Sequence, residues 1–213
     1  MAVPYHIAIE GTIGVGKTSL AKLLSDRLNA TTVLEKFEEN PFLKDFYKDQ
    51  NTYAFQTQLF FLLSRYRQLI DLQQTELFTK TIVSDYMFIK DRLFASLNLD
   101  DKEMNLYDNV AKLLEKNVVN PDLAILLQSD TDRLLENIKK RDRSYEQEIN
   151  WKYLDALNQI YNEFFMKYDK SPLIIINTND IDFVNNPKDL DEIINFIRIP
   201  TKGTRYFNPM KSL

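Results

Sequence analysis

The chain contains no cysteine among its 213 residues, and it has only one histidine, one tryptophan and four glycines. Because cysteine is absent, a disulfide framework and thiol chemistry are excluded, and a reducing compartment is compatible with the sequence. Long hydrophobic runs are absent too, since stretches such as 59–63 and 173–176 are far too short to span a bilayer. We therefore expect a cytoplasmic protein with no membrane partner.

An excess of positive charge is also absent. The 27 lysines and arginines are outnumbered by 31 aspartates and glutamates, which gives a net charge of −4. Binding to a phosphate backbone needs a basic face, so this balance argues against a nucleic-acid partner. The length and the 44% hydrophobic content predict one domain over residues 1–213 with a substantial core. We expect the segment from about residue 200, with its proline, glycine and scattered aromatics, to be irregular.

Three of the four glycines lie within six residues, in the segment Gly11-Thr12-Ile13-Gly14-Val15-Gly16-Lys17-Thr18. The segment matches G-x-x-x-x-G-K-[ST], the phosphate-binding loop, whose backbone N–H groups turn inward on an anion. Tyr5–Glu10 predicts a strand before the loop, and Ser19–Leu28 predicts an amphipathic helix after it. We therefore expect a nucleoside triphosphate to bind Gly11 through Ser19, with Lys17 at the β- and γ-phosphates and Thr18 on Mg²⁺.

Predicted strands alternate with predicted helices along the chain, which is the pattern of an α/β fold with a parallel sheet covered on both faces. Five segments rich in isoleucine, valine and leucine are expected to form the sheet: Tyr5–Glu10, Thr32–Glu35, Thr81–Asp85, Leu123–Leu127 and Leu173–Ile176. Helices are expected at 52–78, 102–117, 131–140, 151–168 and 189–197. Ligands of such sheets bind beyond the carboxyl ends of the strands. Polar residues after each strand are therefore candidate site residues.

Carboxylates stand at the ends of the second and third predicted strands. Glu35 lies where a carboxylate can act as general base on an acceptor hydroxyl. Asp85 is a candidate for the magnesium shell, in the manner of a Walker-B aspartate, with a simple strand-end carboxylate as the alternative. Glu38 and Glu39 instead indicate a solvated helix start, with Asn40 as its cap.

Two arginines alternate in a polar loop between two predicted helices. Arg141 and Arg143 suit a mobile flap that neutralises charge on a phosphoryl group during its transfer. The alternative is a basic helix end, which favours the helix dipole without any further function.

The long predicted helix carries two polar residues on one face. Gln58 and Arg65 are seven residues apart, which is two helical turns. Residues 60–63 are apolar, so we expect the helix to be nearly surrounded by protein, and a polar pair within it indicates a lined pocket. An exposed polar stripe is the alternative.

Together these residues resemble the deoxynucleoside kinase family, and the chain is most similar to its bacterial purine deoxynucleoside kinases. The resemblance extends from the first strand to about Tyr168. It implies the P-loop kinase fold with an arginine-bearing flap (LID), and it implies a role for each matching residue. These roles are general base for Glu35, contact to the sugar 3′-hydroxyl for Tyr47, base contacts for Gln58, Arg65 and Asp91, and flap contacts for Arg141, Arg143 and Glu146.

The chain departs from the family pattern at three positions. Tyr86 follows Asp85 where many members carry an arginine that contacts the 5′-hydroxyl or phosphate, so no arginine role transfers. The phenylalanine that stacks on the base in animal members falls on Ala95 by direct count, and the adjacent Phe94 is our candidate instead. Asp142 stands in the flap where glycine is common.

The resemblance implies transfer of the γ-phosphate of ATP, with Mg²⁺, to the 5′-hydroxyl of a 2′-deoxyribonucleoside in nucleotide salvage. Arg65 can donate to O6 and N7 of guanine, and the trio with Gln58 and Asp91 suits guanine, adenine or cytosine better than thymine. We expect deoxyguanosine or deoxyadenosine as the favoured substrate, deoxycytidine as a further candidate, and a homodimer as the assembly.

Two alternatives stay open. A thymidylate-kinase-like nucleoside monophosphate kinase shares the fold but needs extra cations for the phosphate of its acceptor, and Tyr86 stands where such an arginine is expected. A non-catalytic nucleotide-binding protein, such as a GTPase switch, is the other alternative, although the sequence contains no Asn-Lys-x-Asp guanine motif.

Overall fold

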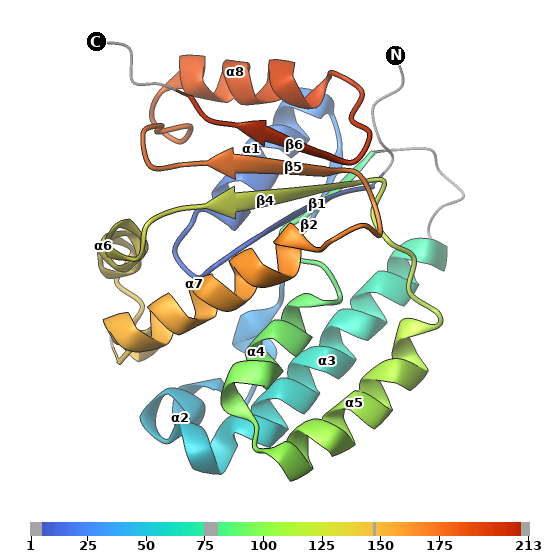
Figure 1. Cartoon of the computed structure of the whole chain (residues 1–213), viewed down its shortest axis with the longest axis vertical. Coiled ribbons are helices and arrows are strands. Elements are labelled where there is room, and N and C mark those ends of the chain that lie inside the picture. Colours follow the sequence, from blue (N-terminus) through green and yellow to red (C-terminus); the bar gives the residue numbers. More distant parts are fainter. Residues whose placement is uncertain (1–5, 75–80, 147, 210–213) are drawn as a thin grey trace.

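A computed structural model describes residues 6–74, 81–146 and 148–209. In it, helices cover both faces of a parallel sheet with the strand order β2-β3-β1-β4-β5-β6 (Figure 1). The strands are β1 His6–Gly11, β2 Thr31–Val33, β3 Ile82–Ser84, β4 Leu123–Gln128, β5 Leu173–Asn177 and β6 Thr204–Phe207. The helices are α1 Lys17–Leu28, α2 Leu43–Lys48, α3 Gln50–Gln74, α4 Lys90–Asn98, α5 Asp101–Glu115, α6 Thr131–Arg141, α7 Trp151–Met166 and α8 Pro187–Ile197, with 3₁₀ turns η1 Phe37–Glu39 and η3 Ser144–Glu146.

Both faces of the sheet are buried because its central strands are apolar at successive positions. On one face, Ile7 and Ile9 of β1 belong to the core that α1 and α8 cover. On the other face, Ala8 belongs to a second core, which contains Leu157 and Tyr161 of α7. Figure 1 shows α8 and α7 on opposite sides of the strands. Successive strand residues point to opposite faces, so strands without polar alternation predict this double burial.

The helices α3, α4 and α5 form a group below the sheet in Figure 1. Leu62, Ala95 and Tyr107 make a common core of these three helices. The short helix α2 packs against the start of α3 through Phe46 and Ala54.

The buried residues of α3, such as Leu62 and Leu69, lie on one face, whereas Arg67 and Asp71 are exposed. The helix is therefore covered on one face, and the prediction that protein nearly surrounds it is wrong.

The sheet has one strand more than the five predicted. Strand β6 lies in the segment from about residue 200 that we expected to be irregular, and it pairs in parallel with β5. Its four residues are too few to show a clear period, and every second one is exposed at the sheet edge. The other strands begin and end within two residues of their predictions, except that Tyr5 lies outside the described residues.

The helices differ from prediction mainly at their ends. The helix predicted at 52–78 is α3, and residues 75–78 lie outside the described part of the chain. Helix α8 begins two residues early because Asn186 caps it and Pro187 fits its first turn. The helix start predicted at Glu38 and Glu39 is the 3₁₀ turn η1, and neither α2 nor α4 was predicted as a separate helix. Within the described residues, no helix is long and apolar enough to cross a membrane.

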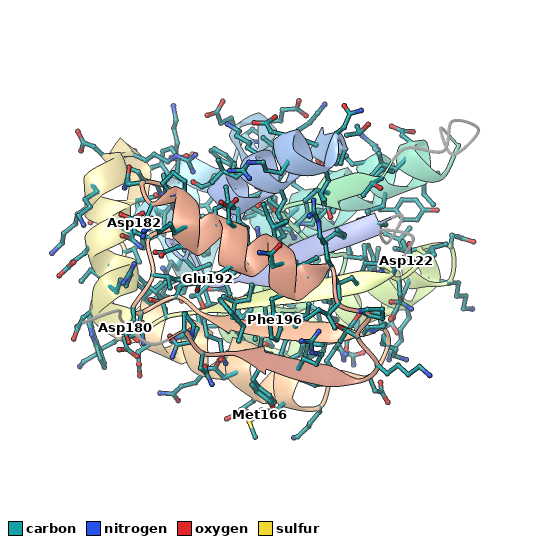
Figure 2. All side chains as sticks on the ribbon, turned by 90° about the horizontal axis from the view of Figure 1, so that it is seen from above. Asp122, Met166, Asp180, Asp182, Glu192 and Phe196 are labelled. Carbon is teal, nitrogen blue, oxygen red and sulfur yellow. The ribbon has the colours of Figure 1, made fainter. Side chains whose placement is uncertain are left out.

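All six strands run in one direction. Asp122, just before β4, lies at one end of the molecule, whereas Asp180 and Asp182, after β5, lie at the other end beside α6 (Figure 2). The loops that follow the strands therefore meet at the end that Asp180 and Asp182 mark.

Candidate active site

A cavity of about 970 Å³ lies at the carboxyl ends of the strands β1 to β5. The loop after each of these five strands contributes to the cavity in turn. The contributing residues are those of the phosphate loop, Glu35, Asp85, Asp130, and residues 178, 179 and 181–185. Most of the predicted site residues line this cavity. They are Ile13, Gly14, Val15, Gly16, Lys17, Thr18, Ser19, Glu35, Tyr47, Gln58, Arg65, Asp85, Phe94, Arg141, Arg143 and Glu146. The predicted residues Gly11, Thr12 and Asp91 are buried and are not part of the lining.

The phosphate loop needs glycine at two positions for steric reasons. Gly11 and Gly14 have positive φ angles of 145° and 87°. A Cβ atom on Gly14 would lie 2.5 Å from the carbonyl oxygen of Leu134, and one on Gly11 would lie 2.6 Å from that of Leu127. Side chains do not approach backbone so closely, so the loop can pack against β4 and α6 only with glycine at both positions.

Lys17 begins α1 and lies over the phosphate loop. Its Nζ donates hydrogen bonds to the carbonyl oxygens of Gly11, at 2.7 Å, and Thr12, at 3.0 Å. Burial, and then the nearby charge of Lys90, lower the pKa of Lys17 to about 7. An anion in the loop would favour the charged ammonium, and the N-terminus of α1 adds to that attraction.

Two oxygen ligands suitable for Mg²⁺ lie side by side next to the phosphate loop. The hydroxyl of Thr18 donates to Asp85 Oδ2 at 2.5 Å, and Asp85 Oδ1 accepts the backbone N–H of Glu35 at 2.7 Å. Mg²⁺ prefers oxygen ligands and takes much of its shell from water and substrate phosphates. A single hydroxyl and a single carboxylate at this position therefore fit the ion. The described residues contain no cluster of three or more histidine, cysteine or acidic side chains suited to a metal.

Two cations hold the carboxylate of Glu35. Arg65 donates to Oε1 from Nε at 2.8 Å and also from Nη2, and Lys90 donates from Nζ to Oε2. Burial alone would raise the pKa of Glu35, but the charges of Arg65 and Lys90 outweigh it and lower the pKa to about 2. Glu35 is therefore ionised at the cavity surface, which is the state that a general base requires.

Arg65 also contacts Asp91, a buried residue that does not line the cavity. Its Nη1 donates to Asp91 Oδ1 at 2.7 Å, and the hydroxyl of Tyr107 donates to Asp91 Oδ2 at 2.9 Å. Burial raises the pKa of Asp91 to about 6, although Arg65 and Tyr107 oppose that rise. The structure thus contains the expected pair of Arg65 and Asp91, with Arg65 between Asp91 and the cavity.

Gln58 presents an unused acceptor to the cavity. The residue is 2% exposed, and its Oε1 has no hydrogen-bond partner within the described part of the chain. A buried acceptor without a partner is unfavourable, so a donor on a ligand is its expected partner. Phe94 also lines the cavity and meets Tyr161 edge-on, with the ring centroids 6.3 Å apart.

The residues of the predicted flap contact one another. Arg141 ends α6 and donates from Nε to Glu146 Oε2 at 2.6 Å, and Arg143 Nη1 reaches Glu146 Oε1 at 3.4 Å. Tyr145, in the 3₁₀ turn η3, stacks on Tyr47, and the two ring centroids are 5.9 Å apart. The flap therefore connects the end of α6 to the residue predicted to contact the sugar.

Sequence reasoning missed several charged residues at the site, and Lys90 and Glu10 are the two that interact with predicted site residues. The carboxylate of Glu10 is fully buried and accepts the backbone N–H of Met87 at 2.6 Å and the hydroxyl of Tyr161 at 3.2 Å. It thereby ties the end of β1 to the segment that follows β3. A carboxylate that ends an apolar strand was the signal for Glu10. For Lys90 the only signal was a lysine directly after the apolar residues 87–89.

Comparisons with known proteins agree with this geometry. A family model described as deoxynucleoside kinase matches residues 7–200. The chain is 36% identical to a deoxyadenosine kinase of Dictyostelium discoideum, over 95% of this chain and 82% of that protein. It is 32% identical to a deoxyguanosine kinase of Bacillus subtilis, over 88% of this chain and 93% of that protein. A solved structure of a deoxyadenosine kinase from M. mycoides with bound dCTP matches with a TM-score of 0.78 at 29% identity, over 90% of this chain and 98% of that one.

Proposed function

The chain belongs to the deoxynucleoside kinase family, and we propose that it transfers the γ-phosphate of ATP to the 5′-hydroxyl of a 2′-deoxyribonucleoside in nucleotide salvage. The predicted α/β fold of P-loop kinases is confirmed. The observation that carries the proposal is the shared cavity, because the ionised Glu35 and the phosphate loop line the same space. A base for the acceptor and a cradle for the donor in one cleft meet the requirements of direct phosphoryl transfer.

In the proposed reaction, the 5′-oxygen forms a bond to the γ-phosphorus while the bond to the β–γ bridging oxygen breaks, and ADP leaves. Glu35 takes the proton of the 5′-hydroxyl. A pKa of about 2 makes Glu35 a weak base, which suits a loose transition state in which the proton leaves late. Lys17, Arg141 and Arg143 stabilise the charge of the group in transfer.

We propose Mg²⁺ as the metal cofactor, with Thr18 and Asp85 as its protein ligands. When bound, the ion neutralises charge on the phosphates of ATP. Asp85 also accepts the backbone N–H of Glu35, so this one side chain links the metal ligands to the acceptor end of the cleft.

We propose that the base binds at Gln58, Arg65 and Phe94, with Asp91 behind Arg65, and that Tyr47 and Glu146 contact the sugar. The unused Oε1 of Gln58 suits an N–H donor of adenine or guanine, and Arg65 suits the O6 and N7 acceptors of guanine. Relatives named for deoxyadenosine and deoxyguanosine support a purine base. Deoxycytidine is a further candidate.

We also propose a homodimer, a cytoplasmic location and one kinase domain over residues 1–213. The homodimer rests on the family resemblance, and the location on the absence of cysteine, which is compatible with a reducing compartment. The single domain rests on the family model, which matches residues 7–200.

An assay of ADP release tests the proposed function across deoxyadenosine, deoxyguanosine, deoxycytidine, thymidine and deoxythymidine monophosphate. We expect kcat/KM for a purine deoxynucleoside to exceed that for thymidine by about 10²-fold or more. Turnover of deoxythymidine monophosphate alone would instead identify a nucleoside monophosphate kinase. ATP binding without turnover of any acceptor would identify a non-catalytic nucleotide-binding protein.

A further inference from the structure

Lys90 is a buried cation that faces the proposed general base. Its side chain is 7% exposed, lines the cavity and pairs with Glu35 Oε2. A buried ammonium group is unfavourable unless it is paired. Tyr86, the residue after Asp85, is fully buried and uncharged, so it supplies no positive charge to this part of the cleft.

Within the described ranges of the chain, the hydrogen bonds that Glu35 accepts leave one acceptor position open on its carboxylate. Each carboxylate oxygen has about two such positions. Oε1 accepts two N–H groups of Arg65, and Oε2 accepts one N–H group of Lys90. The open position is therefore on Oε2, which is the oxygen that Lys90 holds.

The charge balance of the cleft also depends on Lys90. Four carboxylates and three cations interact at the inner end of the cleft, and the formal charges of these seven groups alone sum to −1, or to −2 without Lys90. Other charged residues, such as Arg133 and Glu136, line the rest of the cavity. Burial raises the pKa of Glu10, and the charge of Lys90 is the largest of the effects that oppose this rise. Lys90 therefore acts on the buried Glu10 as well as on Glu35. The seven residues are Glu10, Glu35, Asp85, Asp91, Lys17, Arg65 and Lys90.

We propose that Lys90 is a positioning residue for the phosphoryl acceptor, an inference that rests on the proposed function. Lys90 fixes Oε2 of Glu35 as the atom that takes the proton of the 5′-hydroxyl. As the bond from the 5′-oxygen to the γ-phosphorus forms, the electron pair of the broken bond leaves with ADP. The proton passes to Oε2, and Lys90 keeps its own protons.

Steady-state kinetics of Lys90→Met and Lys90→Arg test this role. We expect Lys90→Met to lower kcat by about 10-fold or more while KM for ATP changes by less than about twofold. Lys90→Arg keeps the charge and a donor for Oε2, so it recovers most of the lost kcat. The matched control is Lys112→Met on α5, which removes an exposed lysine outside the cavity and leaves kcat unchanged. A kcat of Lys90→Met within about twofold of the wild type would overturn the proposal.

A double-mutant cycle with Glu35→Gln separates positioning from a general structural effect. If Lys90 acts through Glu35, adding Lys90→Met to Glu35→Gln costs no more than about threefold further in kcat. Losses that multiply in full contradict the proposal. Should Lys90→Met not fold, Lys90→Leu replaces it with the same expectations, because it also removes both the donor and the charge. A wild type that phosphorylates no deoxynucleoside contradicts the proposed function instead, so the two failures are distinguishable.

Discussion

Several side chains of the cleft each form hydrogen bonds with more than one partner. Arg65 donates to Glu35 and to Asp91, while Glu35 accepts from Arg65 and from Lys90. Asp85 likewise joins the hydroxyl of Thr18 to the backbone of Glu35. Each charged group therefore fixes the geometry of two others, and the loss of one residue affects both the acceptor carboxylate and the base pocket.

Arg65→Met should lower kcat/KM for purine deoxynucleosides by about 10²-fold, or about 3 kcal/mol. The change removes the donors to Glu35 Oε1 and leaves Asp91 with Tyr107 alone, so an unpaired carboxylate remains in a buried site. KM for ATP should change little because the phosphate loop is intact. Adding Asp91→Ala removes that unpaired charge. The double variant should therefore recover part of the kcat/KM for thymidine that Arg65→Met loses. A substrate profile of the three proteins checks this; an equal fall for all bases together with weaker ATP binding would make Arg65 purely structural.

Lys17→Ala should abolish phosphoryl transfer without unfolding the protein. Lys17 lines the cavity, and its ammonium donates hydrogen bonds to the loop carbonyls of Gly11 and Thr12, so the core does not depend on it. Kinase assays and thermal denaturation of the variant check both halves of this statement. Full turnover, or a protein that no longer folds, contradicts the role of Lys17 at the phosphates.

At the scale of elements, the cleft depends on where α3, α4 and α5 are held relative to the sheet. Helix α5 carries Tyr107, the partner of Asp91, although none of its residues lines the cavity. Its start is fixed by a capping box, in which Asp100 accepts the backbone N–H groups of Lys102 and Glu103, and Glu103 accepts that of Asp100. The capping box therefore stabilises α5, although it does not line the cavity.

Asp100→Ala should lower the free energy of unfolding by about 1 kcal/mol, because it leaves two N–H groups at the start of α5 without their side-chain acceptor. The neighbouring Asp101→Ala keeps the cap and is the matched control, with an expected loss of less than about half as much. Urea denaturation of the two variants measures the difference. Equal losses would show that the capping box is not the stabilising feature, and kcat should stay at the wild-type level in both.

The sequence allowed the elements with a strong local pattern to be predicted. The strand before Gly11 and the helix after Lys17 follow from an apolar run and a motif whose residues are neighbours in the chain. Strand β6 was missed because its stability comes from pairing with β5, about 30 residues earlier, rather than from its own four residues. Lys90 was missed as a site residue for a similar reason, since its partner Glu35 lies 55 positions away.

At the scale of the whole molecule, we expect the free energy of unfolding to depend on pH through the single histidine, His6, which lies in strand β1. His6 Nε2 lies 2.9 Å from the hydroxyl oxygen of Ser84, which itself donates to the carbonyl oxygen of Tyr86 at 2.9 Å. Ser84 therefore accepts from His6, and the hydrogen bond joins β1 to β3. Burial lowers the pKa of His6 to about 4, although the charge of Asp122 opposes that fall.

Stability should therefore fall as the pH decreases from about 6.5 towards about 4. The unfolded chain, with an ordinary histidine pKa near 6.5, binds a proton in this window that the folded chain does not bind. Between pH 7 and pH 5 we expect a loss of about 1–2 kcal/mol from His6. Urea denaturation of the wild type and of His6→Gln at both pH values measures it. An equal loss in His6→Gln would assign the pH dependence to the carboxylates instead.

The kinetics of Glu35→Gln test the central claim most directly, which is that one cleft brings a carboxylate base to a phosphate donor. The change keeps the size of the side chain and removes both the base and the charge that Arg65 and Lys90 hold. We predict that kcat for the preferred deoxynucleoside falls by about 10²-fold or more, while the affinity for ATP, measured by calorimetry, stays close to that of the wild type. A near-normal kcat would contradict the account, because it would move the base to Glu38 or Glu39 or remove the need for one.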